Sequence, residues 1–386
     1  GRFLYRTPAE LAKGLDNRTA HELSLAGVAL DRVLANVSDK CWTSEHVSPG
    51  WATLDADSTM GALGREMSQP DARQTLRNCI HGKNAHEPEE VSFLYNLLSF
   101  KGCNSAGPDS QFRVRGGSQA IPLGITKLMK SSVLLNTTVR SVQATTAGVR
   151  VRAEDGREFR ASAAIVTGPP PTVLGLNFDP PLAGPQAQLL QRMPMGTSLK
   201  FAAVYKQGPW WRSAGLQGDI LATSLPPELS LPEPDTGLPI FVQCMDHSPF
   251  SRQLGIIACF LEGRQNLHFT SLSSAEQQRL LLAFLRISFN DSRAETYQPT
   301  FVHHNWADQP FARGAYTGFF PPGVLSVSQY WSAYHQMEKL PNVFLAGGDY
   351  HAGFGNGYIE GAIRDGQDAA MRVEQRLLKS PSGPTL

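Results

Sequence analysis

A glycine-rich stretch near the C-terminal end of the sequence has the residue types of a ligand-holding turn. Residues 344–370 read FLAGGDYHAGFGNGYIEGAIRDGQDAA: an apolar run ends in Gly347, Gly348 and Asp349, and a helical pattern begins near Gly357. Paired glycines let a backbone approach a ligand closely, and an aspartate at a strand end can accept hydrogen bonds from ligand hydroxyls. A helix starting at Gly357 would direct its positive dipole end to the same place. The pattern predicts a site for a ligand that becomes anionic; the alternative is a β-turn-α unit without a ligand.

Other residue clusters do not indicate metal or disulfide chemistry. His81, His86 and Glu87 are close in sequence, but their spacing and loop context are not those of a metal site, and no metal is expected. The five cysteines are scattered and include no C-x-x-C pair. We therefore predict neither a zinc site nor a disulfide framework.

The composition places the chain among globular proteins with a sizeable core. It has 386 residues, of which 41% are apolar, and a formal net charge of +1. This charge gives no electrostatic reason to expect nucleic acid or an anionic membrane as a partner. No apolar run reaches the roughly 18 residues that a membrane span needs, and no signal peptide follows Gly1. We expect a soluble protein. The cytoplasm is slightly favoured over other compartments, but the sequence does not determine the compartment.

The hydrophobic periodicity indicates the elements that must position the glycine-rich turn. Helical spacing predicts helices over 23–35, 91–100 after the acidic run 87–90, 273–289 with Ser273 or Ser274 as cap, and 357–378. Strands are predicted over 199–206, 239–245, 254–261 and 343–346. Between 133 and 167 the alternation, with a turn at Asp155 and Gly156, predicts an antiparallel meander that returns to a buried strand at 163–167.

Several motifs resemble, in the same order, those of the flavin-containing amine oxidases, the family of monoamine oxidases, polyamine oxidases and L-amino-acid oxidases. AGGD at 346–349 and GYIEGA at 357–362 resemble the family's C-terminal signature, which packs on the flavin. The other similar segments are VRGGS (114–118), the meander that ends in FDPPL (135–182), MGTSLK (195–200), Trp306 with GAYT (314–317), and FPPG (320–323).

The resemblance implies a mixed α/β fold in two interleaved domains. A Rossmann-like FAD-binding domain is expected from 116–187 and 309–380, and a substrate domain with a mixed sheet and helices from 1–115 and 188–308, with a disordered tail at 381–386. The family's G-x-G-x-x-G fingerprint and its ribose-binding glutamate do not occur before Gly116. An N-terminal segment outside this sequence is therefore expected to complete the FAD site, with the chain a fragment or one part of a cleaved enzyme.

The resemblance also implies which residues hold the cofactor. Ala315 stands where covalent members of the family have the cysteine that bonds the flavin, so non-covalent FAD is expected. The implied cofactor-binding residues are Val139, Trp306, Ala315, Gly348, Asp349, Tyr358 and Ile359.

The implied reaction is the two-electron oxidation of an amine C–N bond to an imine, with O2 reduced to H2O2. Tyr316 and Tyr358 would form an aromatic cage that guides the amine, and Lys200 would hold a water near the flavin. Tyr95, Leu98 and Cys103 would line the substrate entrance; their alternative role is core packing. The other assignments have structural alternatives as well. Tyr316 and Tyr358 could be ordinary buried tyrosines, and Lys200 a solvated lysine. Trp306 could pack in the core, and Asp349 could stabilise a turn.

Two other functions remain open on the sequence alone. An L-amino-acid oxidase on the same fold would need a cation for the substrate carboxylate, and Arg113, Arg115 and Arg313 lie near the motifs. A non-catalytic member of the family would fit the absence of the fingerprint but not the presence of Lys200 and the two tyrosines.

Overall fold

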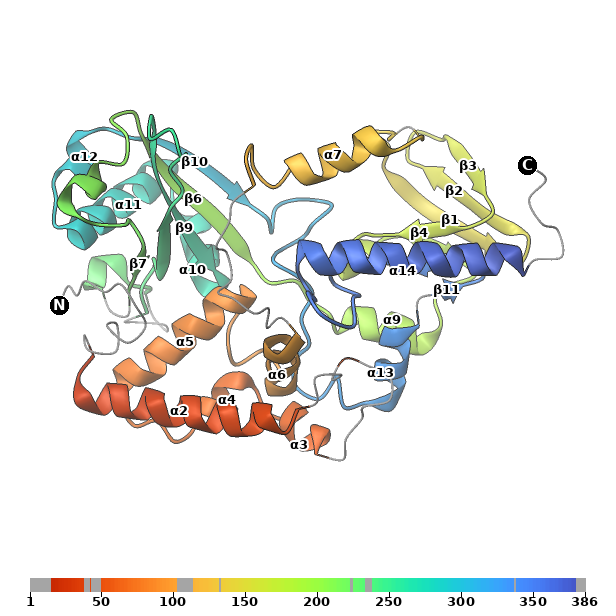
Figure 1. Cartoon of the computed structure of the whole chain (residues 1–386), viewed down its shortest axis with the longest axis horizontal. Helices are drawn as coiled ribbons and strands as arrows, with labels where there is room; N and C mark the ends of the chain where they lie inside the picture. The colour runs from red at the N-terminus through yellow and green to blue at the C-terminus, as the bar shows by residue number, and fades with distance from the viewer. Residues whose placement is uncertain are drawn as a thin grey trace.

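The chain folds into two regions built on separate sheets, joined by a layer of helices (Figure 1). The computed structural model describes residues 15–37, 42, 50–102, 114–131, 133–222, 225–232, 238–336 and 338–379. The fold is mixed α/β, as predicted. The predicted division into domains at 115/116, 187/188 and 308/309 stays a prediction.

The first region is a five-stranded antiparallel sheet with helices packed on one face. The strand order is β10-β6-β9-β8-β7. The strands are β6 (Ser198–Tyr205), β7 (Ile220–Leu221), β8 (Gln243–Asp246), β9 (Gly255–Glu262) and β10 (Thr300–Asn305). The associated helices are η1 (Trp210–Ala214), η2 (Pro227–Leu229), α10 (Gly263–Ser271), α11 (Ser274–Phe289) and α12 (Arg293–Thr296). Alternate residues of β6 and β9 enter a core shared with α11, which we call the closed region.

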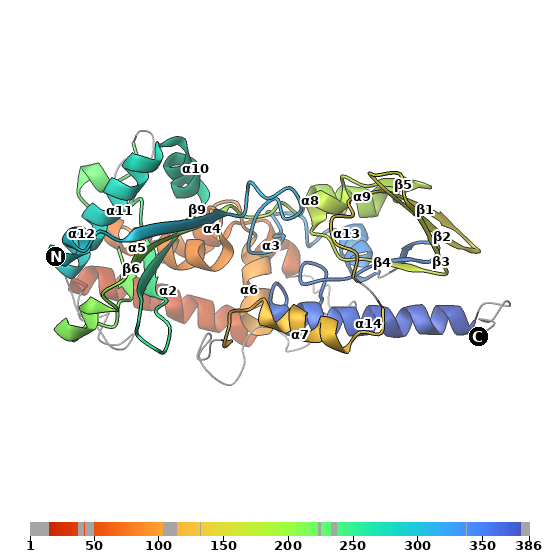
Figure 2. The same cartoon turned by 90° about the horizontal axis from the view of Figure 1, so that it is seen from above.

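The second region, which we call the open region, contains two smaller sheets. A four-stranded sheet has the order β3-β2-β1-β5, and a three-stranded sheet has the order β11-β12-β4. Their strands are β1 (Val139–Thr145), β2 (Gly148–Ala153), β3 (Glu158–Ala161), β4 (Ala164–Val166), β5 (Asn177–Asp179), β11 (Glu338–Leu340) and β12 (Val343–Leu345). Its long helices are α7 (Ala120–Leu128) and α14 (Ile359–Leu378). Figure 2 shows α14 extending along this end of the molecule to the C-terminus.

A helical layer lies beside both sheet regions and shares an apolar core with β12 of the open region. It comprises α2 (Asn17–Ala35), α3 (Trp51–Asp55), α4 (Thr59–Gly64), α5 (Pro70–Asn84) and α6 (Phe93–Gly102). The remaining helices are α8 (Pro170–Val173), α9 (Gly184–Gln191) and α13 (Ser328–His335). The core of this layer includes Leu94, Leu97 and Trp331. No helix in the described ranges is long and apolar enough to cross a membrane.

Most predicted elements are present, but several differ in extent or burial; the helix predicted over 23–35, for example, already begins at Asn17. The expected strand over 239–245 is shorter, because β8 begins only at Gln243. The helix predicted over 91–100 after the acidic run 87–90 is α6, which begins two residues later than predicted, at Phe93, so no acidic residue lies in its first turn. The strand predicted to be buried at 163–167 is β4, whose Ile165 is 39% exposed, because β4 pairs with β12 alone within the described residues.

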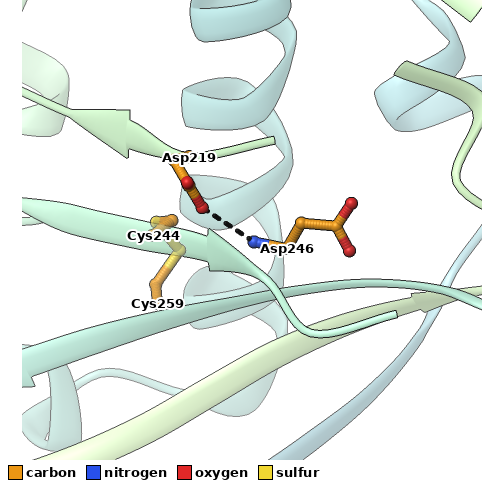
Figure 3. Close-up of a disulfide and its surroundings, with 4 residues drawn as sticks. All are labelled: Asp219, Cys244, Asp246 and Cys259. Carbon is orange, nitrogen blue, oxygen red and sulfur yellow. Dashed lines mark hydrogen bonds between the residues drawn. A yellow bond between two sulfur atoms is a disulfide. The ribbon is translucent and has the colours of Figure 1, made fainter. Parts of the chain in front are cut away.

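The structure contains a disulfide that the sequence did not predict. Cys244 and Cys259 lie directly opposite each other on β8 and β9 and are bonded (Figure 3). Beside them the backbone N–H of Asp246 donates to Asp219 Oδ1 at 3.4 Å. The expectation of no disulfide was wrong because cross-strand register, rather than sequence spacing, brings the two cysteines together.

Candidate functional site

Lys200 lies on the face of β6 that points away from the core of the closed region. Its neighbours Leu199 and Phe201 enter that core. Lys200 pairs with Phe260 on β9 and with His304 on β10. Its Nζ lies 4.7 Å from the centroid of the Phe260 ring, within range of a cation–π interaction. The strand therefore presents an ammonium group above an aromatic ring on one face of the sheet.

The loop after β10 carries three further predicted residues, Trp306, Ala315 and Tyr316, to the start of β6. The N–H of Trp306 donates to Ser198 O at 3.0 Å, which extends the pairing of β10 with β6. The N–H of Ala315 donates to Gly196 O at 2.8 Å. These bonds fix Tyr316, which follows Ala315, beside the start of β6.

Tyr316 is anchored at its hydroxyl end by a buried carboxylate. The hydroxyl donates to Glu262 Oε1, and the ring centroid lies 6.5 Å from that of Phe260. Glu262 ends β9 and is only 4% exposed. Burial raises the pKa of Glu262 to about 6, against the opposing effects of the charge of His81 and of the bond from Tyr316. Burial and the charge of Glu262 hold the pKa of Tyr316 far above its usual range.

A second group of charged and titratable side chains surrounds Glu87, which contacts the chain just after Glu262, at Arg264. Glu87 accepts a bond from Arg77 Nη1 at 2.8 Å and one from the N–H of Arg264 at 3.0 Å, and His81 Nε2 lies 3.6 Å from its Oε1. Burial alone would raise the pKa of Glu87, but His81, Arg264 and Arg77 together lower it to about 2. His86 stacks on Phe319 with centroids 3.5 Å apart.

These histidines and carboxylates do not make a metal centre. Burial lowers the pKa of the His86 imidazole to about 3, so this ring is neutral at physiological pH. Among the described residues, no group of three or more His, Cys, Asp and Glu side chains is arranged to hold a metal ion. The cluster is therefore a buried ion-pair network at the edge of the site.

Asp349 fastens the glycine-rich turn to the loop that carries Tyr316. Its Oδ1 accepts bonds from Thr317 Oγ1 at 2.7 Å and from the N–H of Gly318 at 2.5 Å. On the other side of the turn, the N–H of Gly347 donates to Asp365 Oδ2 at 2.8 Å. The observed role of Asp349 is thus the backbone-binding one; contact with a ribityl chain stays a prediction.

The first turn of α14 lies beside the same loop. The N–H of Gly357 donates to Gly348 O at 2.9 Å, and a Cβ on Gly357, whose φ is 78°, would lie 2.9 Å from Thr317 Cγ2. Glycine is thus required by both conformation and space. α14 begins at Ile359, and the side chain of its N-cap residue, Tyr358, accepts no capping hydrogen bond. Its first N–H groups therefore lack the side-chain cap that satisfies many helix starts.

The assembled residues leave large apolar surfaces uncovered where a planar ligand would be held. Trp306, Tyr316, Tyr358 and Ile359 are 44%, 42%, 48% and 50% exposed, respectively. Tyr358 follows Gly357, which packs against Thr317, the residue after Tyr316. These groups fit a flat aromatic cofactor that carries negative charge when it is reduced. The aromatic rings can stack on such a cofactor, and the ammonium group and the helix N-terminus can stabilise its negative charge.

The other predicted site residues lie elsewhere. Val139 begins β1 in the four-stranded sheet. Tyr95 and Leu98 are buried in the core of the helical layer, where the Tyr95 hydroxyl donates to Gly318 O at 3.5 Å. This position agrees with the core-packing alternative. Cys103 lies outside the described residues.

Sequence reasoning missed Glu262 as a member of the site. A single glutamate at the end of an apolar strand has no motif around it. The one signal was the unusual position of an acid directly after the run GIIACFL, in a strand whose other residues are apolar.

Comparison with known proteins assigns a family to this arrangement. The family of flavin-containing amine oxidoreductases matches residues 81–374. A putative flavin-containing monoamine oxidase of Mycobacterium tuberculosis is 30% identical over 300 residues, which cover 74% of this chain and 59% of the relative. An L-amino acid dehydrogenase of Synechocystis is 29% identical over 290 residues, 74% of this chain and 56% of the relative. The chain thus spans a little over half the length of these two curated relatives.

Solved structures share the same fold. A putrescine oxidase bound to putrescine superposes with a TM-score of 0.80 at 23% identity, covering 97% of this chain and 78% of that chain. At this identity the likeness concerns the fold alone. Together with the family match over most of the sequence, it shows that the chain belongs to the flavin-containing amine oxidoreductases, whose cofactor is FAD.

Proposed function

We propose that this chain takes part in the FAD-dependent oxidation of an amine C–N bond to an imine, with O2 as electron acceptor and H2O2 as product. The observation that carries the proposal is that Lys200 and Tyr316 both lie beside Phe260 on one face of the sheet, while Gly357, just before α14, packs against Thr317, the residue after Tyr316. FAD, when bound, supplies the two-electron acceptor. The protein supplies the orientation and the electrostatics.

Each of these residues has a distinct task in the proposal. Tyr316 and Tyr358 present exposed ring faces that attract a cationic amine and orient it. Lys200 places its ammonium on the same face and holds a water beside the cofactor. The N-terminus of α14 stabilises negative charge on the ligand.

We further propose that the flavin is held without a covalent bond to Ala315. The Ala315 side chain is a methyl group and provides no thiolate for a thioether. Acid precipitation tests this directly, because a non-covalent flavin leaves with the supernatant. Yellow colour retained in the precipitate would contradict it.

The open region supports the proposal that another polypeptide segment completes the FAD site. α7 buries no side chain within the described residues, although it is rich in apolar residues. Leu128, Leu135 and Ile165 are all exposed. Parallel strand pairs such as β4 and β12 are normally covered on both faces. If such a segment completes the site, we expect FAD to bind more weakly to this chain alone than to this chain together with that segment.

An L-amino-acid substrate is the second candidate, and the Synechocystis relative favours testing it. Arg115 and Arg313 are exposed, and Arg313 lies two positions before Ala315. Arg113 lies outside the described residues. A panel of amines and L-amino acids, assayed both for peroxide release and with an artificial electron acceptor, separates an oxidase from a dehydrogenase.

The flavin measurement comes first and decides between a catalytic and a non-catalytic protein. The complete reading frame should show flavin absorbance between about 350 and 500 nm and release peroxide with an amine. The absence of flavin after reconstitution with FAD would reject the proposal.

Replacement of Lys200 tests the role assigned to it. Lys200→Met should slow oxidation with O2 by about 100-fold, as loss of a preorganised charged group does. The matched control is Lys206→Met, which removes the exposed lysine that follows the same strand. Equal rates in the two variants would contradict the role of Lys200.

A further inference from the structure

The hydroxyl of Tyr316 and the carboxylate of Glu262 form a pair that the proposed reaction does not yet use. The Tyr316 hydroxyl donates to Glu262 Oε1. The Tyr316 ring is partly exposed, whereas Glu262 is 4% exposed, so the aromatic face is open while the hydroxyl end is enclosed. Glu262 and Phe260 lie two residues apart on β9, opposite Ser198 and Lys200. All four side chains therefore point to the same face of the sheet.

We infer that Glu262 is a positioning residue whose ionisation fixes the Tyr316 hydroxyl and sets the pH range in which this face of the site favours a cationic amine. An ionised Glu262 accepts the hydroxyl bond and adds one negative charge behind the Tyr316 ring. A protonated Glu262 is neutral and has a proton of its own to donate. The two states thus present the amine with different charge and a different hydrogen bond.

The surroundings of Glu262 favour a titration near neutral pH. Burial disfavours the ionised carboxylate and raises its pKa to about 6, as described above. The charge of His81 on α5 acts in the opposite direction and lowers the pKa of Glu262. The titratable and charged groups around the pair are Tyr316, Tyr358, Lys200, His81, His86, Glu87, Arg77 and Arg264.

A spectroscopic titration tests the coupling without any turnover. Tyrosine labelled with carbon-13 at the ζ position gives one resonance per tyrosine, and Tyr316→Phe identifies that of Tyr316. In the wild type this resonance should shift with a midpoint near the pKa of Glu262, about 6. Glu262→Gln keeps the shape and an acceptor oxygen but removes the charge, so the shift should disappear.

Two further variants assign the titration. Glu90→Gln removes another carboxylate whose pKa burial raises, and the shift should remain. A histidine ordinarily titrates in the same pH range. A shift that persists in Glu262→Gln and disappears in His81→Gln would therefore overturn the inference, as would a Tyr316 resonance that is unchanged between about pH 5 and pH 8.

The kinetic consequence rests on the proposed function. kcat/KM for an amine should fall on the acid side with a midpoint near 6. Glu262→Gln should remove this acid limb and raise KM by about tenfold with little change in kcat, because a negative charge behind the cation is lost. Tyr316→Phe should move the limb to higher pH, because the ionised carboxylate loses its donor. Glu90→Gln should leave the limb in place.

The experiments can reject the proposed function and the coupling of Glu262 to Tyr316 independently of each other. A protein that oxidises no amine but shows the Glu262-dependent shift loses the proposed function and keeps the coupled pair. A protein that oxidises amines with an acid limb unaffected by Glu262→Gln keeps the proposed function and loses the inference.

Discussion

The closed and open regions of the molecule bury their apolar residues to very different extents. In the closed region, residues such as Phe201, Phe241 and Leu281 are completely enclosed between the sheet and α11. In the open region, α7 encloses nothing and β4 has one uncovered edge within the described residues. The candidate site lies where the two meet, with Lys200 and Glu262 from the closed region and Tyr358 from the open one. The first region thus encloses its apolar residues, whereas the second leaves apolar residues of α7 and β4 exposed.

The largest expected effect is in the core of the closed region. Leu281→Ala removes a fully buried side chain and should lower the free energy of unfolding by about 2–5 kcal/mol. Leu128→Ala makes the same chemical change on α7, where the side chain is 85% exposed, and should change it by less than about 0.5 kcal/mol. Denaturant unfolding of the two variants measures this difference. Similar losses would mean that α7 is packed and that the regions do not differ as described.

The next effect concerns the ion-pair network at the border of the closed region. Glu87→Gln leaves Arg77 and His81 without their shared carboxylate and should cost about 3 kcal/mol near pH 7. Because the pKa of Glu87 is lowered to about 2, its stabilising contribution is complete above the usual carboxyl pKa near 4.5 and is lost as the pH falls towards 2. The difference from wild type should therefore shrink in acid.

The control for Glu87→Gln is a second glutamate that bonds the same arginine, Arg77. Glu89 also bonds Arg77 but is exposed, so Glu89→Gln should change the free energy of unfolding by less than about 1 kcal/mol. Unfolding curves at neutral and acid pH for both variants provide the measurement. An equal cost for Glu87→Gln and Glu89→Gln would show that burial does not strengthen this network.

The smallest effect compares the starts of two long helices. α11 is capped by Ser273, whose hydroxyl accepts from the N–H of Glu276 at 3.3 Å, whereas α14 has no side-chain cap within the described residues. Ser273→Ala should cost about 1 kcal/mol. Ser274→Ala, one residue inside α11, should cost nothing measurable because alanine is a good helix former. If both cost the same, the capping bond is not what stabilises the start of α11.

Local patterns predicted the central strands and the longest helix of each region. Ser273 caps α11 as one of the two expected residues, and β6, β9 and β12 lie within a residue of their predicted bounds. The turn at Gly156 joins β2 to β3 as expected, with a positive φ of 87°. These features depend on neighbours in sequence, where propensity and periodicity act.

The sequence by itself determined the mixed α/β fold, the family and the residues worth examining, because motif residues keep their order along the chain. Only the tertiary structure decided which of them meet. Cross-strand register placed Lys200 over Phe260, bonded Cys244 to Cys259 and set the acid Glu262 behind Tyr316. It also showed that β4 is half-exposed rather than buried. The physical reason is that burial, charge pairing and pKa depend on partners far apart in sequence, whose distances local patterns do not contain.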